Sequence, residues 1–209
     1  PAMSAPPYSR SPPDAREFTR RFDRAYTSFG GAYDRAVRLL PVWRRWLDQV
    51  LPHLRGPRVL EVSFGTGYLL TRYAGDFETH GIDYNERMIE VADANLARCG
   101  ARARLLRADV LALPYGDAAF DCIVNTMALS GYPDAGRALA EMRRVLRPEG
   151  RLVLIDVGFP ADRNRLGMLI ARGWQWAGDL VRDSHSLLEG AGVKAREEMG
   201  GGRSGSDQI

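Results

Sequence analysis

The sequence predicts an α/β fold with a doubly wound, mostly parallel sheet, and two observations lead to this prediction. From Arg58 onward, short apolar runs alternate with segments of helical periodicity, which is the rhythm of consecutive β-α-β units. The chain of 209 residues is 45% hydrophobic and 26% charged, the balance of a globular domain that can bury a substantial core. No apolar run reaches the roughly 18 to 20 residues that a membrane-spanning helix requires.

Two helices are expected to precede the sheet. Asp14 can cap the first of them, and Gly30 with Gly31 is expected to end it. Pro41 suits the first turn of a second helix that runs to about Leu54. Aromatic residues recur at helical spacing along the first helix, at Phe18, Phe22 and Tyr26. Such a stripe either packs on the core or covers a site, and we interpret residues 14–55 as a helical lid or arm.

The α/β domain is expected to span residues 56–199. Its strands are predicted, in chain order, at Val59–Val62, Thr79–Ile82, Ala103–Leu106, Phe120–Val124 and Leu152–Ile155. Its helices are predicted at Tyr68–Ala74, Glu86–Cys99 and Asp134–Leu146. Residues 1–13 are rich in proline and read as a disordered tail or a cloning remnant, and residues 200–209 as a flexible tail.

Charge and cysteine usage narrow the class of partner. The net charge is +3, yet residues 1–60 hold 11 arginines against 5 acidic residues. A basic arm of this kind could meet an anionic membrane surface. Basic residues do not interleave with aromatic residues in a stripe, so we expect no nucleic-acid partner. The sequence leaves the oligomeric state open.

The two cysteines, Cys99 and Cys122, lack metal-ligand spacing and lie in apolar patterns. We therefore predict no metal site, and two reduced core thiols in a cytoplasmic protein.

The first motif lies where the first predicted strand meets its helix. Residues Glu61 to Gly67 read Glu-Val-Ser-Phe-Gly-Thr-Gly, and glycines in such a loop let the backbone approach a ligand. A tight strand-to-helix turn would explain the glycines equally well. A dinucleotide fold would place a third glycine where Leu70 stands, and this bulky residue disfavours that class.

Acidic residues end the next two predicted strands. Asp83 can accept hydrogen bonds from both hydroxyls of a ribose; the alternative role, capping the following helix, is better filled by Asn85. Asp109 can accept from an adenine amino group, with Val110 against the ring, although an aspartate in that position is often only a turn residue.

Together these motifs resemble the class I S-adenosylmethionine-dependent methyltransferases. The likeness is greatest to the branch of menaquinone and ubiquinone biosynthesis C-methyltransferases and related small-molecule enzymes, and it covers roughly residues 20–195. It rests on Glu61 to Gly67, on Asp83 with Met88, on Asp109-Val110, on Phe120 to Val124, and on Glu141 to Gly150.

The resemblance implies a Rossmann-like methyltransferase fold, S-adenosyl-L-methionine as cofactor, and a role for each matching residue. The backbone at Ser63, Gly65 and Gly67 would underlie the methionine half, with Glu61 supporting the loop. Asp83 would hold the ribose, Tyr84 and Met88 would flank the adenine, and Asp109 with Val110 would bind its edge and face. Asn125 and Met127 would line the methionine and acceptor side, and Tyr26 would be a lid residue. The implied reaction is in-line methyl transfer to a small-molecule acceptor that is apolar, quinol-like or lipid-like.

Two of the chain's departures from the family pattern bear on the site and on the sheet. Ser63 and Phe64 stand where the family usually has glycine and a small residue, so Phe64 is expected to be bulky beside the cofactor. The chain stops at Ile209, so the last strand of the sheet is expected to be short or missing.

A catalytic base is not evident from the sequence. His53 and His80 are expected at the amino-terminal edge of the sheet, away from the site, which leaves His185 as the histidine to test. Two other functions remain open: a cofactor-binding module of the same fold without catalytic activity, and a nucleotide-dependent oxidoreductase.

Overall fold

A computed structural model shows one parallel sheet covered by helices. The described part of the chain consists of residues 12, 14–39, 41–156, 158, 165, 168–169, 171–173, 180–181 and 187–188, without the side chains of 26, 29–39, 41 and 42. The strands are β1 (Arg58–Val62), β2 (Glu78–Asp83), β3 (Arg104–Arg107), β4 (Phe120–Thr126) and β5 (Leu146–Ile155). The helices are α1 (Ala15–Leu39), α2 (Pro41–Asp48), α3 (Leu70–Tyr73), α4 (Glu86–Cys99) and α5 (Ala135–Val145), with 3-10 turns η2 (Leu51–His53) and η3 (Leu129–Gly131).

The strand order is β3-β2-β1-β4-β5, and all four pairs of neighbouring strands are parallel. The chain begins in the centre with β1, moves out to β3, and returns to β4 on the other side of β1. Val62 at the end of β1 therefore pairs with Ile82 of β2 and with Asn125 of β4. Where neighbouring connections diverge in this way, a crevice opens outside the carboxyl ends of the strands. The predicted doubly wound parallel sheet is confirmed.

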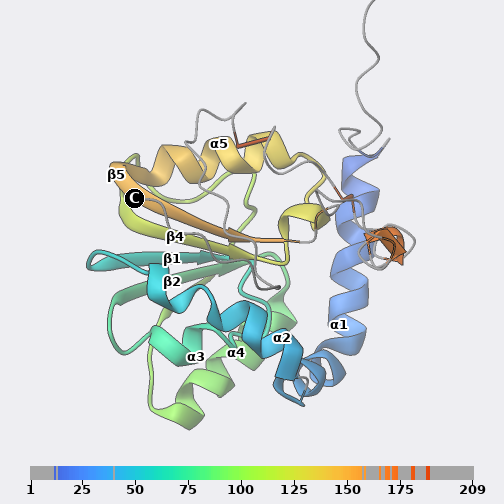
Figure 1. Ribbon diagram of the computed structural model, residues 1–209, viewed down its shortest axis with the longest axis horizontal. Helices are drawn as coiled ribbons and strands as arrows, with labels where there is room; N and C mark the ends of the chain where they lie inside the picture. The colour runs from blue at the N-terminus through green and yellow to red at the C-terminus, as the bar shows by residue number, and fades with distance from the viewer. Residues whose placement is uncertain are drawn as a thin grey trace, which may run out of the picture.

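Helices cover both faces of the sheet and one of its ends. In Figure 1, α5 lies above the sheet and α3 and α4 lie below it, while α1 stands upright beyond the tips of the strand arrows. Local signals explain the helix ends: Asn85 Oδ1 accepts from Met88 N at 3.0 Å at the start of α4, and Gly100 ends it with φ +71°. Asp134 caps α5 in the same manner, through Arg137 N at 2.9 Å.

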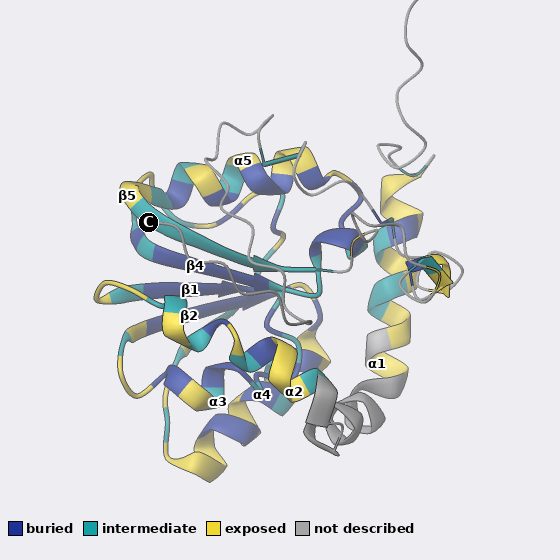
Figure 2. Ribbon diagram, viewed as in Figure 1, coloured by how far each residue is buried: buried dark blue, intermediate teal, exposed yellow. Residues whose placement is uncertain are grey.

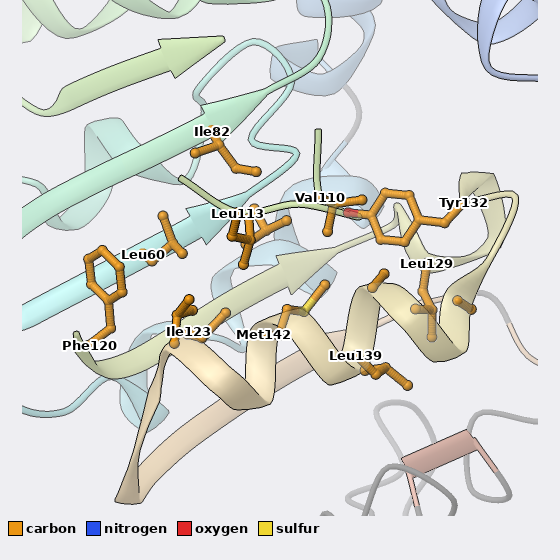
Figure 3. Packing of buried hydrophobic residues seen from close by; sticks show 14 residues of the cluster. Leu60, Ile82, Val110, Leu113, Phe120, Ile123, Leu129, Tyr132, Leu139 and Met142 are labelled. Carbon is orange, nitrogen blue, oxygen red and sulfur yellow. The ribbon is translucent and has the colours of Figure 1, made fainter. Parts of the chain in front are cut away.

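The core has one hydrophobic cluster on each face of the sheet. One cluster contains Leu60, Ile123, Leu139 and Met142, and packs α5 against β1 and β4; Figure 3 shows it with Tyr132 among its members. The other cluster packs α3 and α4 against the opposite face. Figure 2 shows β1 and β4 buried and β5 of intermediate burial. The three central strands, β2, β1 and β4, are therefore the most buried ones.

The prediction that Gly30 and Gly31 end the first helix is wrong. The helix continues through both residues to Leu39, although Asp14 begins it as predicted, by accepting from Glu17 N at 3.0 Å. Glycine inside a helix costs about 1 kcal/mol relative to alanine but does not forbid it. A glycine that ends a helix adopts the left-handed conformation that Gly100 has after α4.

Smaller differences concern the ends of elements. The predicted helix Tyr68–Ala74 is reduced to α3, and β5 begins at Leu146 instead of Leu152 because the strand contains an irregularity beside Phe120 and Cys122 of β4. Residues 1–11, 13 and 200–209 of the predicted tails lie outside the described residues, as do His185 and the chain end where a last strand would form.

The cysteine prediction holds for one residue. Cys122 is a buried free thiol in β4, whereas Cys99 is exposed at the carboxyl end of α4, with Sγ donating to Leu96 O at 3.2 Å. The buried residues of α4, such as Ala92 and Leu96, precede Cys99, which is the last residue of the helix. The predicted burial of Cys99 is therefore wrong. Within the described residues, no helix is long and apolar enough to cross a membrane. The predicted cytoplasmic location stays a prediction.

Candidate cofactor-binding site

The loop after β1 is held in a backbone conformation that favours glycine. Ser63, Gly65 and Gly67 have φ values of +56°, +56° and +71°, all in the left-handed region. A Cβ on Gly67 would lie 2.7 Å from Cβ of Ala92 in α4. The loop therefore turns sharply and its end presses against α4, while Ser63 N donates to Ile82 O of β2 at 2.8 Å.

Asp83, at the end of β2, connects this loop to the next one. Its Oδ2 accepts from Gly65 N at 2.9 Å and its Oδ1 accepts from Asn85 N at 2.9 Å. The side chain is buried, and this burial raises the pKa of Asp83 to about 6, although hydrogen bonds from backbone amides act in the opposite direction. The carboxyl group is thus fixed in place by backbone donors and lines the crevice.

Glu61 lies one strand over and deeper. It is 1% exposed, and its Oε2 accepts from the Tyr73 hydroxyl at 2.8 Å. Burial, with the nearby charge of Asp83, raises the pKa of Glu61 to about 8. At neutral pH its carboxyl group is therefore mostly protonated, which lets two acidic side chains share the base of one cavity.

The third acidic residue differs from these two because it faces water. Asp109 is exposed at the end of β3, and its Oδ1 accepts from Leu111 N at 2.9 Å, so it forms the turn that the sequence left as an alternative. Val110 is buried beside it. Both residues still line the same cavity as Asp83, because parallel strands bring their carboxyl ends to one edge.

Nine of the twelve predicted cofactor-contacting residues line one cavity at this edge: Glu61, Ser63, Gly65, Asp83, Tyr84, Met88, Asp109, Val110 and Met127. Gly67 and Asn125 are not among its lining residues. Gly67 underlies the loop against α4 instead. The side chain of Tyr26 lies outside the described residues.

The side chain of Asn125 points into the core. It is wholly buried at the end of β4, and its Nδ2 donates to Val62 O at 3.1 Å and to the Tyr132 hydroxyl at 2.7 Å. The residue two positions later, Met127, has φ +54° and does line the cavity. Asn125 therefore lies behind Ser63, and its predicted place on the methionine side stays a prediction.

Phe64 also points differently from the expectation. Its ring is 6% exposed and packs on β2, where a Cβ on Gly81 would lie 2.7 Å from the ring. Because Gly81 has no side chain, the aromatic ring fits between the loop and the sheet. Phe64 still borders the cavity, but most of its bulk belongs to the core.

Helix α1 closes the cavity from outside the sheet. Asn85 Nδ2 donates to the backbone oxygen of Asp23 at 3.0 Å, to Asp23 Oδ1 at 2.7 Å and to Thr27 Oγ1 at 2.8 Å. Asn85 thus caps α4 with its oxygen and binds α1 with its nitrogen. The position of α1 at the strand tips is the one that a lid over the site requires (Figure 1).

Several lining residues were not singled out from the sequence. They come from α1, from α2 and from the segment after β4, and they include Thr19, Asp23, Trp43, Leu47, Tyr132 and Pro133. Trp43 and Leu47 lie four residues apart in the predicted second helix, so helical spacing was the available signal. This spacing does not tell which neighbour the two side chains face. Asp23 had no signal, since a single acidic residue on a helix is usually solvated.

The described histidines lie where they were predicted, away from the cavity. His80 is buried within β2, with its ring 5.2 Å from that of Phe120 and 5.6 Å from that of Tyr115. Burial lowers the pKa of His80, so it is a neutral core residue. His53 ends η2 before β1.

Comparison with known proteins agrees with this geometry. A family model described as a methyltransferase domain matches residues 59–150. The chain is 33% identical to demethylmenaquinone methyltransferase of Thermus thermophilus over 69% of each chain, and 31% identical to that of Staphylococcus aureus over 66% of this chain and 60% of the relative. The crystal structure of the [4+2]-cyclase SpnF superposes with a TM-score of 0.60 at 27% identity, covering 70% of this chain and 54% of SpnF.

The parallel order β3-β2-β1-β4-β5, the glycine loop against a buried strand-end aspartate, and these matches point to the same conclusion. The chain belongs to the class I S-adenosylmethionine-dependent methyltransferases, whose methyl donor is S-adenosylmethionine.

Proposed function

We propose that this protein transfers a methyl group to an apolar, quinol-like small molecule, in the cavity bounded by Asp83, Met127 and α1. The observation that carries the proposal is that one cavity is lined both by polar groups at the strand ends and by apolar side chains from α1, α2 and the segment after β4. The polar groups suit a nucleoside, and the apolar side chains suit the acceptor.

The polar groups fit S-adenosylmethionine. A carboxylate has about four acceptor positions, and Asp83 uses two of them for Gly65 N and Asn85 N. The Tyr84 amide also interacts with this carboxyl group, and acceptor capacity remains for a ribose hydroxyl. Asp109 is exposed beside Val110 and Tyr84, so its carboxylate and their side chains suit the amino group and the faces of an adenine.

The apolar side chains support the acceptor class. Phe22, Trp43 and Leu47 from the two amino-terminal helices face the cavity, with Met127 and Pro133 from the segment after β4. A planar, apolar ring would lose water on entering such a site, and the demethylmenaquinone methyltransferases are named for a quinone of this kind. A lipid-like acceptor would use the same side chains. Contact of the basic amino-terminal segment with an anionic membrane stays part of this proposal.

The residues of this chain mainly position the cofactor and the acceptor. The bound cofactor supplies a methyl group on a sulfonium centre, which leaves as a neutral thioether after in-line attack. Alignment and exclusion of water are the remaining requirements. Helix α1 meets the second of these by closing over the strand tips through Asn85, and an easily ionised phenol or quinol needs no strong base.

A second function is favoured by one specific comparison. SpnF, named as a [4+2]-cyclase, has the same fold at 27% identity, so a protein of this fold can carry a name other than methyltransferase. This chain could likewise bind the cofactor without transferring its methyl group. The oxidoreductase alternative has no comparable support, since Leu70 occupies the third glycine position.

The test uses the whole chain with methyl-labelled S-adenosylmethionine and a panel of reduced naphthoquinones, phenols and amines. We expect label in a hydroquinone product, with a mass increase of one methylene. Affinity for S-adenosylhomocysteine without label in any product would favour the cofactor-binding alternative. Stronger binding of NAD than of S-adenosylmethionine would contradict the proposal altogether.

A further inference from the structure

Three polar side chains form a hydrogen-bonded chain from the core to the cavity wall. Asn125 Nδ2 lies 2.7 Å from the Tyr132 hydroxyl, and the Tyr132 hydroxyl donates to Ser63 Oγ at 2.8 Å. Asn125 and Tyr132 are buried, whereas Ser63 is half-buried and lines the cavity. The chain therefore ends in a hydroxyl group at the cavity surface.

The direction of these hydrogen bonds can be assigned from their buried end. Val62 O can only accept, and it lies 3.1 Å from Asn125 Nδ2. Turning the amide round would put two acceptors face to face, so the nitrogen must point this way, even though Asn125 Oδ1 then has no hydrogen-bond partner in the described part of the chain. The second hydrogen of the same nitrogen points to the Tyr132 oxygen, and the phenol hydrogen goes on to Ser63 Oγ.

This direction leaves Ser63 as a donor toward the cavity. Its oxygen accepts from Tyr132, so its own hydrogen is free to rotate into the space that Ser63 lines. Two carboxyl groups, those of Glu61 and Asp83, border the same space. A negatively charged ligand group at this wall would need a donor between them.

The backbone shows that this side chain is kept at a cost. Ser63 has φ +56°, a conformation that favours glycine and costs other residues free energy. Serine has a higher conformational free energy than glycine at this φ, yet its hydroxyl group is hydrogen-bonded to Tyr132. This combination indicates that the hydroxyl group has a function.

We propose that the Ser63 hydroxyl, oriented by Tyr132 and Asn125, donates a hydrogen bond to the carboxylate of the methionine half of the cofactor. This inference rests on the proposed function, because it requires S-adenosylmethionine in the cavity. It adds a side-chain ligand to the backbone donors of the loop, and it makes Tyr132 and Asn125 positioning residues.

The test compares two ligands by calorimetric titration of the full chain. S-adenosylhomocysteine has the amino-acid carboxylate, and methylthioadenosine has the same nucleoside and sulfur without it. In Ser63→Ala and in Ser63→Gly, we expect affinity for S-adenosylhomocysteine to fall about tenfold or more, because a hydrogen bond to a charged group is lost. Affinity for methylthioadenosine should change less than about twofold.

Two further variants separate the hydroxyl from general effects on the loop. Tyr132→Phe keeps the ring but frees the Ser63 hydroxyl, so we expect a smaller loss for S-adenosylhomocysteine, about threefold. Ala118→Gly is the matched control, because Ala118 also has a positive φ, of +51°, and is not among the cavity-lining residues; its affinities should stay unchanged. Thermal melts verify that each variant folds, and Ser63→Gly suits the backbone even if Ser63→Ala does not.

The inference is overturned if Ser63→Gly binds S-adenosylhomocysteine as tightly as the natural chain, or loses affinity for both ligands equally. An unchanged affinity with a raised KM for the methyl acceptor would assign the hydroxyl to the acceptor instead. Failure of the natural chain to bind S-adenosylhomocysteine would contradict the proposed function itself, so the two failures are distinguishable.

Discussion

Acidic side chains at the two ends of the parallel strands have different partners. At the amino-terminal edge, arginines neutralise the carboxylates: Arg58 pairs with Glu78 at 3.1 Å, and Arg147 pairs with Asp121. At the carboxyl-terminal edge, Asp83 and Glu61 are bound by backbone amides and by the Tyr73 hydroxyl. No arginine pairs with either of them in the described part of the chain.

This difference indicates that the amino-terminal edge contributes to stability, whereas the carboxyl-terminal edge has the features of a ligand-binding site. Arginine pairs at the amino edge leave the carboxylates satisfied and the ring of Phe120 covered by Arg58. At the carboxyl edge, burial without a cation raises two pKa values. Ser63 and Met127 also keep left-handed backbone there. Unfavourable local free energy at one edge, tolerated because the rest of the domain is well packed, is typical of a binding site.

The largest expected effect is on the pH dependence of stability, through Glu61. Its pKa of about 8 in the folded state lies above its unfolded value, so the folded state holds an extra proton at neutral pH and the free energy of unfolding falls as pH rises toward 8. We expect a loss on the order of 3 kcal/mol between pH 6 and 8.5. Glu61→Gln, which still accepts from Tyr73, should abolish most of this loss in urea unfolding.

Glu78→Gln is the control from the amino edge. Hydrogen bonding to His80 and the charge of Arg58 lower the pKa of Glu78, so this residue is already ionised above pH 6. Its variant should keep the steep pH dependence of the natural chain. If the free energy of unfolding of Glu61→Gln depended on pH as it does in the natural chain, Glu61 would not be the source of the pH dependence. The proposed difference between the two edges would then be wrong.

Removing Asp83 should weaken cofactor binding by about 2 kcal/mol or more, because hydrogen bonds between a buried carboxylate and the ribose hydroxyls are lost. The measurement is calorimetric titration of Asp83→Ala with S-adenosylhomocysteine. Asp121→Ala, which removes a carboxylate bound to Arg58 N at the other edge, should lower stability and leave the affinity unchanged. Similar affinity losses in both variants would show that stability alone is being measured.

A methyl group at Gly81 should destabilise the fold by about 1.5 kcal/mol through overpacking. Its Cβ would lie 2.7 Å from the ring of Phe64 and 2.9 Å from the side chain of Leu105. Gly75→Ala is the matched control, since nothing lies within 4 Å of a Cβ there. Thermal unfolding of both variants, and of Gly81→Ala combined with Phe64→Leu, measures the contact; no recovery in the double variant would argue against it.

The smallest expected effect concerns the attachment of α1. Asp23→Ala removes one of the oxygens that Asn85 Nδ2 contacts, and we expect about 1 kcal/mol less protection of α1 amides in hydrogen exchange. Turnover should fall more than cofactor affinity, because closure over the acceptor is loosened. Arg24→Ala, an exposed residue of the same helix, should change neither.

The sequence was sufficient wherever a local signal decides the structure. The predicted bounds of α4 match because Asn85 and Gly100 supply both of its caps within the helix's own neighbourhood. Asp83 is the last residue of β2, and Asp109 follows the end of β3 by two residues, so both positions could be predicted from where the apolar runs stop. Nine of the twelve predicted cofactor contacts line the cavity for the same reason, since a parallel sheet brings all such strand ends to one edge.

Only the tertiary structure decided where side chains turn and which elements meet. Phe64 packs on Gly81, and Asn125 points inward to Tyr132. Helix α1 continues past Gly30 and is attached to the strand tips through Asn85. None of these contacts joins near neighbours in the chain, so periodicity and capping carry no information about them. The amino acids by themselves determined the fold and the edge at which the cavity lies, because backbone propensity and burial pattern act locally. Long-range packing decided the shape, charge state and closure of the cavity.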